Sequence, residues 1–393
     1  MAIRQIDKLD FKDKRILLRL ELNVPLKDGK VQDTTRIEQA LPTVKFLLKG
    51  GASVIIVAHA GRPNGNVVEE LRLTEIAKEM EKLLGHKIKK LDEAIGKKVE
   101  KEIEKMKPGE IIMLENIRFY PEEEANDIKF SKTLASYADY FVMDAFGTTH
   151  RAHASTHGVA EYIPAYAGIL VSKEIHALSP LLEQPRRPIT LVLGGAKIWS
   201  KIGIIKNFIA KADHILLGGG IANTFLYAQG HYVGESLFEK DKVDIAREIM
   251  LDCEKNHDQL HLPEDVIVAD EMSDDAKTLN VPVTDIEGDA KIFDIGPRTA
   301  EKYAQIIKNS QTIFWNGPMG LYEHPPFKKG SETIAKAMAE TYGTAIVGGG
   351  DSVDCIKRCG YKREDFTHIS TGGGASLEFL AGTMLPGIEP LLK

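Results

Sequence analysis

Two glycine triplets near the end of the chain are the residues whose type and spacing point most directly to chemistry. An apolar run at residues 345–347 leads into GGGDS, and a second run at 368–370 leads into TGGGASLE. Each segment predicts a strand, a glycine turn and a helix, which begins at Asp351 or Ser352 in the first case and at Ser376 in the second. Glycines let backbone N–H groups approach a ligand closely, and a helix N-terminus carries about half a positive charge. Both segments are therefore candidate anion-binding sites, and together they suggest phosphate chemistry.

A second set of chemically useful side chains follows the strands expected in the first half of the chain. Its members stand at the end of a strand or at the start of the next helix, and they are Glu21, Asn23, Arg36, His59, Arg62, Arg118 and Arg151. A single arginine is more often a solvated surface charge, but surface arginines have no reason to collect at one edge of a sheet. The planar guanidinium group binds phosphate and carboxylate oxygens two at a time. The first half therefore predicts a basic cleft for an anionic ligand.

The second half carries polar side chains of a complementary kind. Lys197 and Lys201 are spaced by one helical turn after a strand and two glycines, so both ammonium groups are expected to reach one anion. Glu323, after the turn WNGP, is a carboxylate that suits the hydroxyls of a ribose. Asp351 has two interpretations that the sequence leaves equal, a ligand of Mg²⁺ and the N-cap of a helix. The motif GxxxxGK[ST] is absent and no GxGxxG stands at the first strand-to-helix turn, which argues against a P-loop enzyme and weakens a dinucleotide-binding interpretation.

The elements that must position these residues are strands alternating with helices. In the first half the expected strands are RILLRLEL (15–22), SVIIVAH (53–59), IIML (111–114) and YFVMDAF (140–146). The same rhythm restarts at residue 188 with ITLVLGG, DHILLGGG, EDVIVAD, KIFDIG, QTIFWNG and TAIVGGG. Such alternation predicts an α/β protein with mostly parallel sheets, each covered by helices on both faces. Ligands bind such sheets beyond the carboxyl ends of the strands, where nearly all the residues named above fall.

The segment LLEQPRRPI interrupts this alternation. Its prolines and arginines place a domain boundary near residues 172–188. We therefore expect a first domain over residues 1–172, a hinge over 173–187 and a second domain over 188–379. Two domains also agree with the length, because a chain of 393 residues exceeds the size at which one hydrophobic core keeps growing.

Composition and charge exclude several classes of protein. The 51 basic and 57 acidic residues give a net charge of −6, which argues against a nucleic-acid-binding protein. The N-terminal residues lack the apolar core of a signal peptide, and no apolar run has the length of a membrane span. The three cysteines form no paired framework, which favours a reducing compartment. We expect a cytoplasmic protein that binds neither nucleic acid nor membrane.

Ten segments of the chain, taken in order, resemble the motif set of the phosphoglycerate kinases. They are RLELNVPL, DTTRI, AHAGRP, LENIRF, DAFGTTHRAHAS, GGAKIWSKI, GGGIANTFL, WNGPMGLYE, GGGDS and STGGGASLE. The resemblance runs from about residue 15 to residue 387, essentially the whole chain. It implies a glycolytic kinase with two Rossmann-like domains joined by a hinge, in which residues 380–393 return to complete the first domain. The implied reaction transfers a phosphoryl group reversibly between 1,3-bisphosphoglycerate and ADP, with Mg²⁺, giving 3-phosphoglycerate and ATP; we expect a monomer.

The resemblance also assigns roles to individual positions. It places the binding of 3-phosphoglycerate on Glu21, Leu22, Asn23, Arg36, His59, Ala60, Gly61, Arg62, Arg118 and Arg151. It places the nucleotide on Lys197, Lys201, Asn316, Glu323, Gly349, Gly350, Asp351 and Ser352, with the metal on Asp351. Because the attacking oxygen is already ionised near neutral pH, no general base is needed, and catalysis must come from positioning and charge stabilisation. We expect Arg36, Lys197, Lys201 and the backbone amides near Gly350 and Gly373 to supply it, after the domains close.

Several positions depart from the usual pattern of this family. Glu21 stands where aspartate is usual, Ala58 and Ala60 replace serine and leucine beside His59, and Tyr120 replaces a histidine. In GGAKIWSKI, Trp199 and Ser200 stand where small residues and an aspartate are usual. We expect the chemistry to be retained and substrate affinity or domain closure to be altered. Two alternatives remain, a phosphate-binding or nucleotide-binding homologue that has lost catalysis and an NAD-dependent oxidoreductase.

Overall fold

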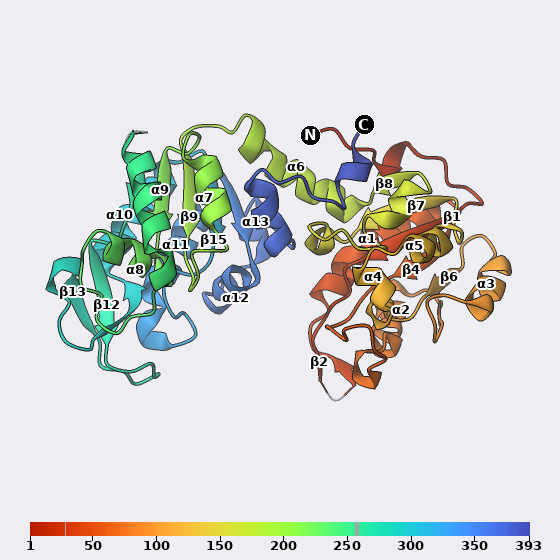
Figure 1. Ribbon diagram of the computed structural model, residues 1–393, viewed down its shortest axis with the longest axis horizontal. Helices are drawn as coiled ribbons and strands as arrows, with labels where there is room; N and C mark the ends of the chain where they lie inside the picture. Colours follow the sequence, from red (N-terminus) through yellow and green to blue (C-terminus); the bar gives the residue numbers. More distant parts are fainter. Residues whose placement is uncertain (28, 256–258) are drawn as a thin grey trace. The chain divides into compact units, whose positions relative to one another are not determined.

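The computed structural model describes residues 1–27, 29–255 and 259–393, and it divides into two compact units. Unit 1 comprises Met1–His176 together with Met384–Lys393, and unit 2 comprises Ala177–Thr383. The division falls inside helix α6, which spans Ile169–Glu183 (Figure 1). Within the described parts of the chain, no helix is both long and apolar enough to cross a membrane.

Unit 1 is built on a parallel sheet with the strand order β5-β6-β4-β1-β7-β8. The strands are β1 (Arg15–Leu20), β4 (Ser53–Val57), β5 (Ile88–Lys90), β6 (Ile111–Met113), β7 (Tyr140–Asp144) and β8 (Ala165–Ala167), and a small hairpin joins β2 (Leu26–Lys27) to β3 (Lys30–Val31). In register, Leu17 of β1 lies between Ile55 of β4 and Phe141 of β7. Because the central strands are buried on both faces, their sequences are continuous apolar runs and do not alternate.

Helices flank this sheet and bury its apolar side chains. They are α1 (Thr35–Lys49), α2 (Thr74–Leu84), α3 (Lys97–Glu104), α4 (Pro121–Glu124) and α5 (Ile128–Ala135). On one face Ile37 and Val44 of α1 and Ile76 of α2 pack against Ile16 and Val54 of the sheet. The amphipathic spacing of α1 and α2 thus positions the strand ends from which the candidate site residues project.

Unit 2 repeats this plan with the strand order β11-β10-β9-β15-β16-β17, again parallel. The strands are β9 (Ile189–Leu193), β10 (His214–Leu217), β11 (Leu260–His261), β15 (Thr312–Asn316), β16 (Thr344–Gly348) and β17 (His368–Ile369). The helices are α7 (Ile202–Phe208), α8 (Gly219–Ala228), α9 (Val243–Lys255), α10 (Pro297–Asn309), α11 (Lys329–Glu340), α12 (Gly350–Arg358) and α13 (Gly374–Leu380). Tyr303 of α10, Ile334 of α11 and Ile356 of α12 share a core with Trp315 and Val347 of the sheet. The predicted α/β class with parallel sheets is confirmed.

The prediction that the strands of the second half belong to a parallel sheet is wrong for two segments. The segments EDVIVAD and KIFDIG form β12 (Asp265–Ala269) and β14 (Lys291–Ile295), which pair antiparallel in a separate small sheet with β13 (Leu279–Pro282). A parallel crossover needs about a dozen residues, usually a helix, between its strands. Only residues 270–278 connect β12 to β13, which is too short for a parallel crossover, so these two strands pair antiparallel, and β14 pairs antiparallel with the other edge of β12.

The predicted helix starts at the two glycine triplets are also wrong, by one or two residues. Helix α12 begins at Gly350 with Gly349 as its N-cap, and α13 begins at Gly374 with Gly373 as its N-cap. Both N-caps have a positive φ, 92° and 52°, which glycine adopts without the strain that a Cβ brings. Asp351 therefore lies exposed in the first turn of α12, and the N-cap interpretation of this residue is wrong.

Candidate active site

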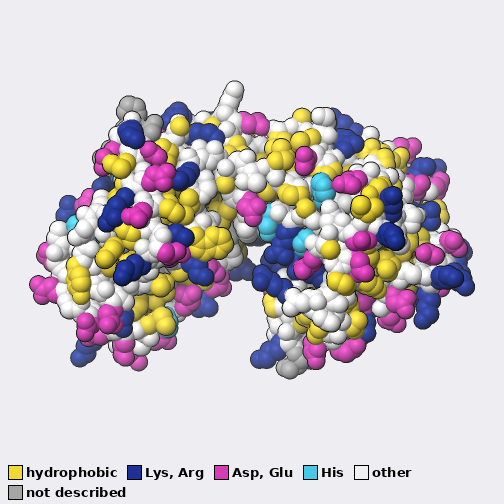
Figure 2. All heavy atoms as spheres, in the orientation of Figure 1, with side chains coloured by type: hydrophobic (Ala, Val, Ile, Leu, Met, Phe, Trp, Pro, Cys, Tyr) yellow, Lys and Arg dark blue, Asp and Glu magenta, His cyan; other side chains and the backbone are white. Residues whose placement is uncertain are grey.

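In unit 1 the carboxyl ends of β1, β4, β6 and β7 bring most of the predicted basic residues to one edge of the sheet. Figure 2 shows basic side chains and histidines gathered on one edge of this unit. The centre of the group is His59, which follows β4 and is only 2% exposed. Burial lowers the pKa of His59 well below its ordinary value, and so do the positive charges of Arg19, Arg118, Arg151 and Arg36. We call these four arginines around His59 the arginine cluster.

Backbone contacts hold the other predicted residues beside this cluster. The amide of Gly61 donates to Asn23 Oδ1 over 2.9 Å, and Arg118 Nη1 donates to the carbonyl of Gly61 over 2.9 Å. The side chain of Asn116 accepts from the amide of Ala60 and donates to its carbonyl, at 3.3 and 2.8 Å. Asn116 also caps the short 3₁₀ helix η3, Ile117–Phe119, in which Arg118 lies. The loops after β1, β4 and β6 are therefore fixed to one another.

Three acidic side chains contact or face the cluster, namely Glu21, Glu123 and Glu124, whose Oε1 lies 3.4 Å from Arg118 Nε, and sequence reasoning noted only Glu21. Glu21 Oε1 lies 3.6 Å from Arg36 Nη1, and the same guanidinium donates to the carbonyl of Asn23. Glu123, which the sequence did not single out, is fully buried and its charge faces Arg19. Cations outnumber carboxylates here, and burial with neighbouring arginines lowers the pKa of Arg118 to about 10. Arg36 is exposed and Arg151 is half-buried, and such an excess of positive charge favours binding of an anion.

The remaining residues predicted for unit 1 take different positions. Leu22 and Ala60 are buried, and Gly61 has a φ of 63°, the left-handed conformation that suits glycine. Arg151 is half-buried and donates from Nε to His150 Nε2 over 3.2 Å. Arg62 is exposed. Arg19 is the main residue that sequence reasoning missed, although a charged side chain inside the buried strand RILLRL was a signal for it.

In unit 2 the glycines at the strand ends are packed closely against one another. A Cβ on Gly317 would lie 2.3 Å from the carbonyl oxygen of Gly194, and one on Gly194 would lie 2.1 Å from that of Pro318. Gly195 donates its amide to the carbonyl of Pro318 over 2.8 Å. The turns after β9 and β15 can approach this closely only because both carry glycine.

The glycines that begin α12 and α13 are different because space is open beside them. No atom lies within 4 Å of a Cβ built on Gly350, Gly373 or Gly374. Ser352 fixes the start of α12, since its hydroxyl accepts from the amide of Gly317 over 2.7 Å. In α13 the hydroxyl of Ser376 is bonded to that of Ser370 over 2.6 Å. Two helix N-termini are thus held rigidly, with room for an anion beside their first residues.

The two lysines of the segment GGAKIWSKI do not lie on a helix, so the expected helical spacing is wrong. Helix α7 begins at Ile202, and both lysines precede it. Lys197 is exposed, whereas Lys201 is buried and its Nζ lies 3.4 Å from Ser200 Oγ. Burial lowers the pKa of Lys201, and the charges of Asp351 and Glu239 oppose that effect. Trp199, between the lysines, is 60% exposed.

Carboxylates lie near the start of α12. Glu323 and Asp351 are both exposed, and their charges, with that of Asp354, help burial to raise the pKa of Tyr322. Asn316 is buried and its amide donates to the carbonyl of Gly348 over 2.8 Å, which joins the ends of β15 and β16. Within the described ranges of the chain no three His, Cys, Asp or Glu side chains are arranged around a metal ion. A metal at Asp351 would therefore complete its coordination with phosphate oxygens and water, as Mg²⁺ does.

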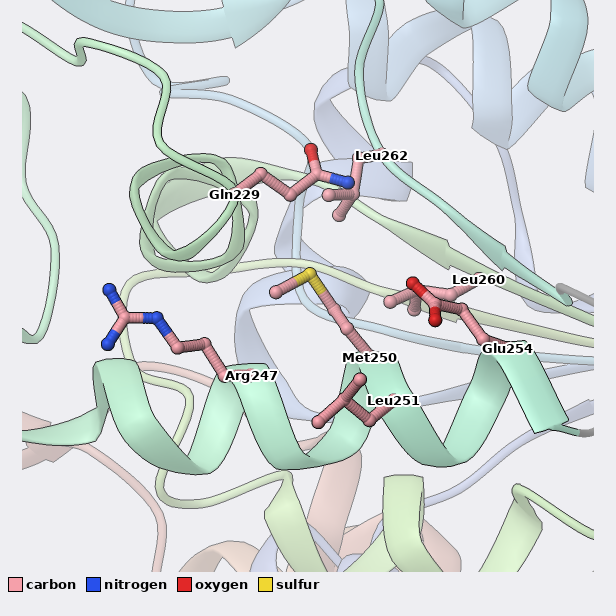
Figure 3. A pocket seen from close by; sticks show the side chains of 7 residues that line it. All are labelled: Gln229, Arg247, Met250, Leu251, Glu254, Leu260 and Leu262. Carbon is pink, nitrogen blue, oxygen red and sulfur yellow. The ribbon is translucent and has the colours of Figure 1, made fainter.

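A pocket of about 350 Å³ in unit 2 is separate from these residues. Figure 3 shows it between α9, the end of α8 and the strand β11, lined by Gln229, Arg247, Met250, Leu251, Glu254, Leu260 and Leu262. Gln229 is the C-cap of α8, whereas the glycines at the sheet edge begin that helix. A ten-residue helix is roughly 15 Å long, so the pocket lies at the opposite end of α8 from the candidate site.

Comparison with known proteins gives one consistent result. The family model of phosphoglycerate kinase matches residues 6–383. The phosphoglycerate kinase of Dictyoglomus turgidum is 52% identical over 383 residues, which cover 97% of this chain and 96% of the relative. That of Moorella thermoacetica is 48% identical over 393 residues and the full length of both chains.

Solved structures agree with the sequence comparisons. The structure of phosphoglycerate kinase from Coxiella burnetii superimposes with a TM-score of 0.91 at 39% identity, covering 99% of this chain and 98% of the other. The crystal structure of the enzyme from Pyrococcus horikoshii OT3 gives a TM-score of 0.84 at 32% identity, with the same coverage.

Proposed function

The chain belongs to the phosphoglycerate kinase family, and from this premise we propose that unit 1 binds 3-phosphoglycerate and unit 2 binds ATP or ADP. The reaction is the reversible transfer of a phosphoryl group between 1,3-bisphosphoglycerate and ADP, which gives 3-phosphoglycerate and ATP. The observation that carries the assignment of unit 1 is the arginine cluster around the buried His59. A ligand with a phosphate and a carboxylate at its two ends would neutralise this excess of positive charge.

The residues proposed for the triose are those that these contacts bring to the edge of unit 1. Arg36, Arg118 and Arg151 supply guanidinium groups, and Asn23 and Gly61 supply the polar backbone and side-chain groups between them. Arg62 is exposed and is proposed to reach the ligand from the surface. Glu21, beside Arg36, is proposed to accept a hydrogen bond from the triose hydroxyl.

For the nucleotide, the proposal rests on the open space at the start of α12 and α13. The amides near Gly350 and Gly373 donate to phosphate oxygens, and Lys197 and Lys201 provide the opposing charges. Glu323 is proposed to bind the ribose, with Asn316, Gly349 and Ser352 holding the surrounding turns in place. Mg²⁺ bound at Asp351 would shield the negative charges of the phosphate groups.

The chemistry requires positioning and charge stabilisation and no proton abstraction. The acceptor oxygen is a carboxylate of 3-phosphoglycerate or a phosphate oxygen of ADP, and both are ionised near neutral pH. The charge that develops on the transferred group is proposed to be stabilised by Arg36, Lys197, Lys201 and the amides near Gly350 and Gly373. Because the two ligands bind to different units, transfer in line requires domain closure.

Wider features of the protein are part of the same proposal. The triose-binding domain would comprise residues 1–172 and 380–393, the hinge 173–187 and the nucleotide-binding domain 188–379. The long helix α6 across the predicted hinge supports this division. We further propose a cytoplasmic monomer that binds no nucleic acid and no membrane, in keeping with its net charge of −6.

The alternative of a homologue that binds without catalysis is favoured by one contact. Arg36, the arginine proposed to stabilise the transferred group, is held by Glu21 and by the carbonyl of Asn23. Because these partners compete with the triose for Arg36, they would weaken its binding.

The first experiment is release of ADP from Mg·ATP with and without 3-phosphoglycerate. We expect release that depends on the triose, and a loss of about a hundred- to a thousand-fold in kcat in Arg36→Ala, as for the removal of one oxyanion-hole donor. Arg15→Met is the matched control, because Arg15 lies at the opposite, amino end of β1. A protein that binds ATP but shows no triose-dependent release would support the non-catalytic alternative.

A further inference from the structure

Arg19 occupies an unusual place, because its charged side chain is fully buried in the central strand of unit 1. Its Nη1 donates to the carbonyl of Leu20 over 2.6 Å and its Nε donates to Ser155 Oγ over 2.9 Å. Its Nη2 lies 3.0 Å from Nδ1 of His59. Removing a guanidinium group from water is costly unless it is paired, so this set of contacts needs an explanation beyond packing.

The directions of these hydrogen bonds follow from the chemistry of arginine. A guanidinium group has N–H donors and no acceptor, so Nδ1 of His59 must accept from Arg19 and cannot carry a proton. The ring is then neutral, and its single proton is on Nε2. In the described part of the chain, no hydrogen bond uses Nε2.

Glu123 and Ser155 keep Arg19 in this orientation. Ser155 Oγ accepts from Arg19 Nε and donates to Glu123 Oε1 over 2.6 Å, and the amide of Ser155 donates to Glu123 Oε2 over 2.8 Å. Burial raises the pKa of Glu123, and the charge of Arg19 and the two hydrogen bonds from Ser155 oppose that effect. The chain of contacts from Glu123 through Ser155 and Arg19 to His59 is therefore fixed at each step.

The charged groups around the ring come from each element that packs against it. They are Arg19 on β1, Arg36 on α1, Arg118 on η3 and Arg151 in the loop after β7, with His150 and His153 in that same loop and with the acidic groups Glu21, Glu123 and Glu124, the last paired with Arg118. Positive charge dominates this set. A proton on Nδ1 would therefore face four cations as well as lose the hydrogen bond from Arg19.

We infer that Arg19 is a positioning residue that holds His59 as the neutral tautomer with its proton on Nε2, so that His59 serves the triose site as a hydrogen-bond donor and not as a cation. The part of this inference that concerns the triose rests on the proposed function. A neutral donor suits the carboxylate or hydroxyl of 3-phosphoglycerate, and its contribution does not change with pH between about 5.5 and 8, where an ordinary histidine titrates.

The direct test is ¹⁵N NMR of the histidine rings in the full-length protein, with the signal of His59 assigned from His59→Gln. We expect an unprotonated Nδ1 and a protonated Nε2 from pH 5.5 to 8. A protonated Nδ1 at pH 7, alone or in an imidazolium, would overturn the inference. The wild-type spectrum shows the tautomer without an activity assay. A failure of the proposed function would therefore be seen separately, as a protein that has this tautomer but shows no triose-dependent release of ADP.

The role of Arg19 is tested in the double variant Arg19→Met with Glu123→Gln, which removes both buried charges and leaves neither unpaired. We expect His59 to populate both tautomers and to titrate near its ordinary range. The KM for 3-phosphoglycerate should rise by about twofold or more at pH 8, because only about half of the neutral rings then carry the proton on Nε2. At pH 5.5 the rise should be smaller, because a protonated His59 then attracts the substrate.

The quantity to compare is the ratio of the variant KM to the wild-type KM, in which titration of the substrate's own phosphate cancels. A ratio that does not change with pH, together with an unchanged tautomer, would show that Arg19 does not position His59. Arg15→Met on the same strand is the matched control and should alter neither the spectrum nor the ratio. If the double variant does not fold, the wild-type spectrum still decides the tautomer.

Discussion

Glu21 and Ala60 are the residues of the proposed triose site at which we expect a departure from the usual family pattern, and Glu21 is the one that carries a charge. Its carboxylate lies 3.6 Å from Arg36, whose side chain is 43% exposed. An ion pair in such a position is worth about 0.2–1 kcal/mol, because solvent screens it. Glu21 therefore restrains Arg36 only weakly. We expect this ion pair to change the affinity for the triose.

Shortening this side chain in Glu21→Asp should release Arg36 and lower the KM for 3-phosphoglycerate by at most about five-fold, the equivalent of about 1 kcal/mol for that ion pair. Steady-state kinetics with varied triose and saturating Mg·ATP measures the change. Glu38→Asp on α1 is a suitable control, because Glu38 contacts Thr34 and no residue of the cluster. An unchanged KM would remove Glu21 from any account of how this protein differs from its relatives.

A residue of the candidate site could be predicted from sequence only where it directly follows the apolar strand that positions it. His59 and Arg118 follow apolar runs, so their place at the sheet edge was predictable. Arg19 lies within such a run, and its partner Ser155 is 136 positions away in the chain. Contacts of this kind depend on the pairing of β1 with β7, which local pattern does not specify.

At the scale of elements, the glycines of unit 2 separate into two kinds with different predicted effects. Gly317→Ala places a Cβ 2.3 Å from a backbone oxygen at a φ of 90°, so it should destabilise the protein by about 2 kcal/mol or more. Gly350→Ala meets nothing within 4 Å and lies in a helix, so stability should be equal or slightly higher. Thermal unfolding of the two variants compares these effects directly.

The same Gly350→Ala variant tests the nucleotide site, since its methyl group enters the space where phosphate is proposed to bind. The KM for Mg·ATP should rise while stability does not fall. Tight nucleotide binding by this stable variant would mean that the space beside Gly350 is not used by the ligand.

Asp144, at the end of β7, links that strand to the start of α6. Its Oδ1 accepts from the amides of Leu170 and Val171 at 2.8 and 3.2 Å. Burial raises the pKa of Asp144 from 3.8 to about 7, although these bonds, with the side chain of Thr43, act to lower it. The folded state therefore binds a proton more tightly than the unfolded state. What the protonated Asp144 contributes to the free energy of unfolding is fully present below about pH 4 and is lost as the pH rises to about 7.

Asp144→Asn removes this titration and keeps an oxygen for the two amides. The free energy of unfolding of the wild type, relative to the variant, should fall between about pH 4 and pH 7 by an amount of the order of 4 kcal/mol, and then level off. Urea unfolding at several pH values measures it. Asp127→Asn is the control, because Asp127 also caps a helix, α5, but is not fully buried. Parallel pH curves for wild type and Asp144→Asn would contradict the assignment.

The success of sequence reasoning for elements follows the period of the apolar pattern. Strands buried on both faces, such as β4, have continuous apolar runs, and these strands were predicted. The direction of β12 and β14 was not predictable from their apolar runs, because direction depends on what connects them. The starts of α12 and α13 were missed because glycines with positive φ serve as N-caps where a polar side chain was expected.

At the scale of the whole molecule, the chain leaves unit 1 and returns to it at its end. Leu385, Ile388 and Leu391 are at most 1% exposed. Residues of this segment are held by hydrogen bonds from Arg4 N to the carbonyl of Leu391 over 2.7 Å and from Gly387 N to that of Thr149 over 2.8 Å. Nothing local to residues 384–393 specifies these partners, so only the family resemblance anticipated the return of the segment.

Deleting Met384–Lys393 should therefore unfold unit 1 and leave the core of unit 2 intact. Burying each of the three apolar side chains contributes about 1.5–3 kcal/mol, and their sum is comparable to the whole stability of a domain. Hydrogen exchange read by mass spectrometry should show fast exchange in β1 and β4, with continued protection in β9 and β15. Slow exchange in all four strands would mean that unit 1 is stable without the segment.

A milder change tests the same segment by point substitution. Leu391→Ala is expected to lower the free energy of unfolding by about 2–5 kcal/mol, and its less buried neighbour Leu392→Ala is the control. Because each unit has its own core, a loss confined to unit 1 is the result that distinguishes two cooperative units from one.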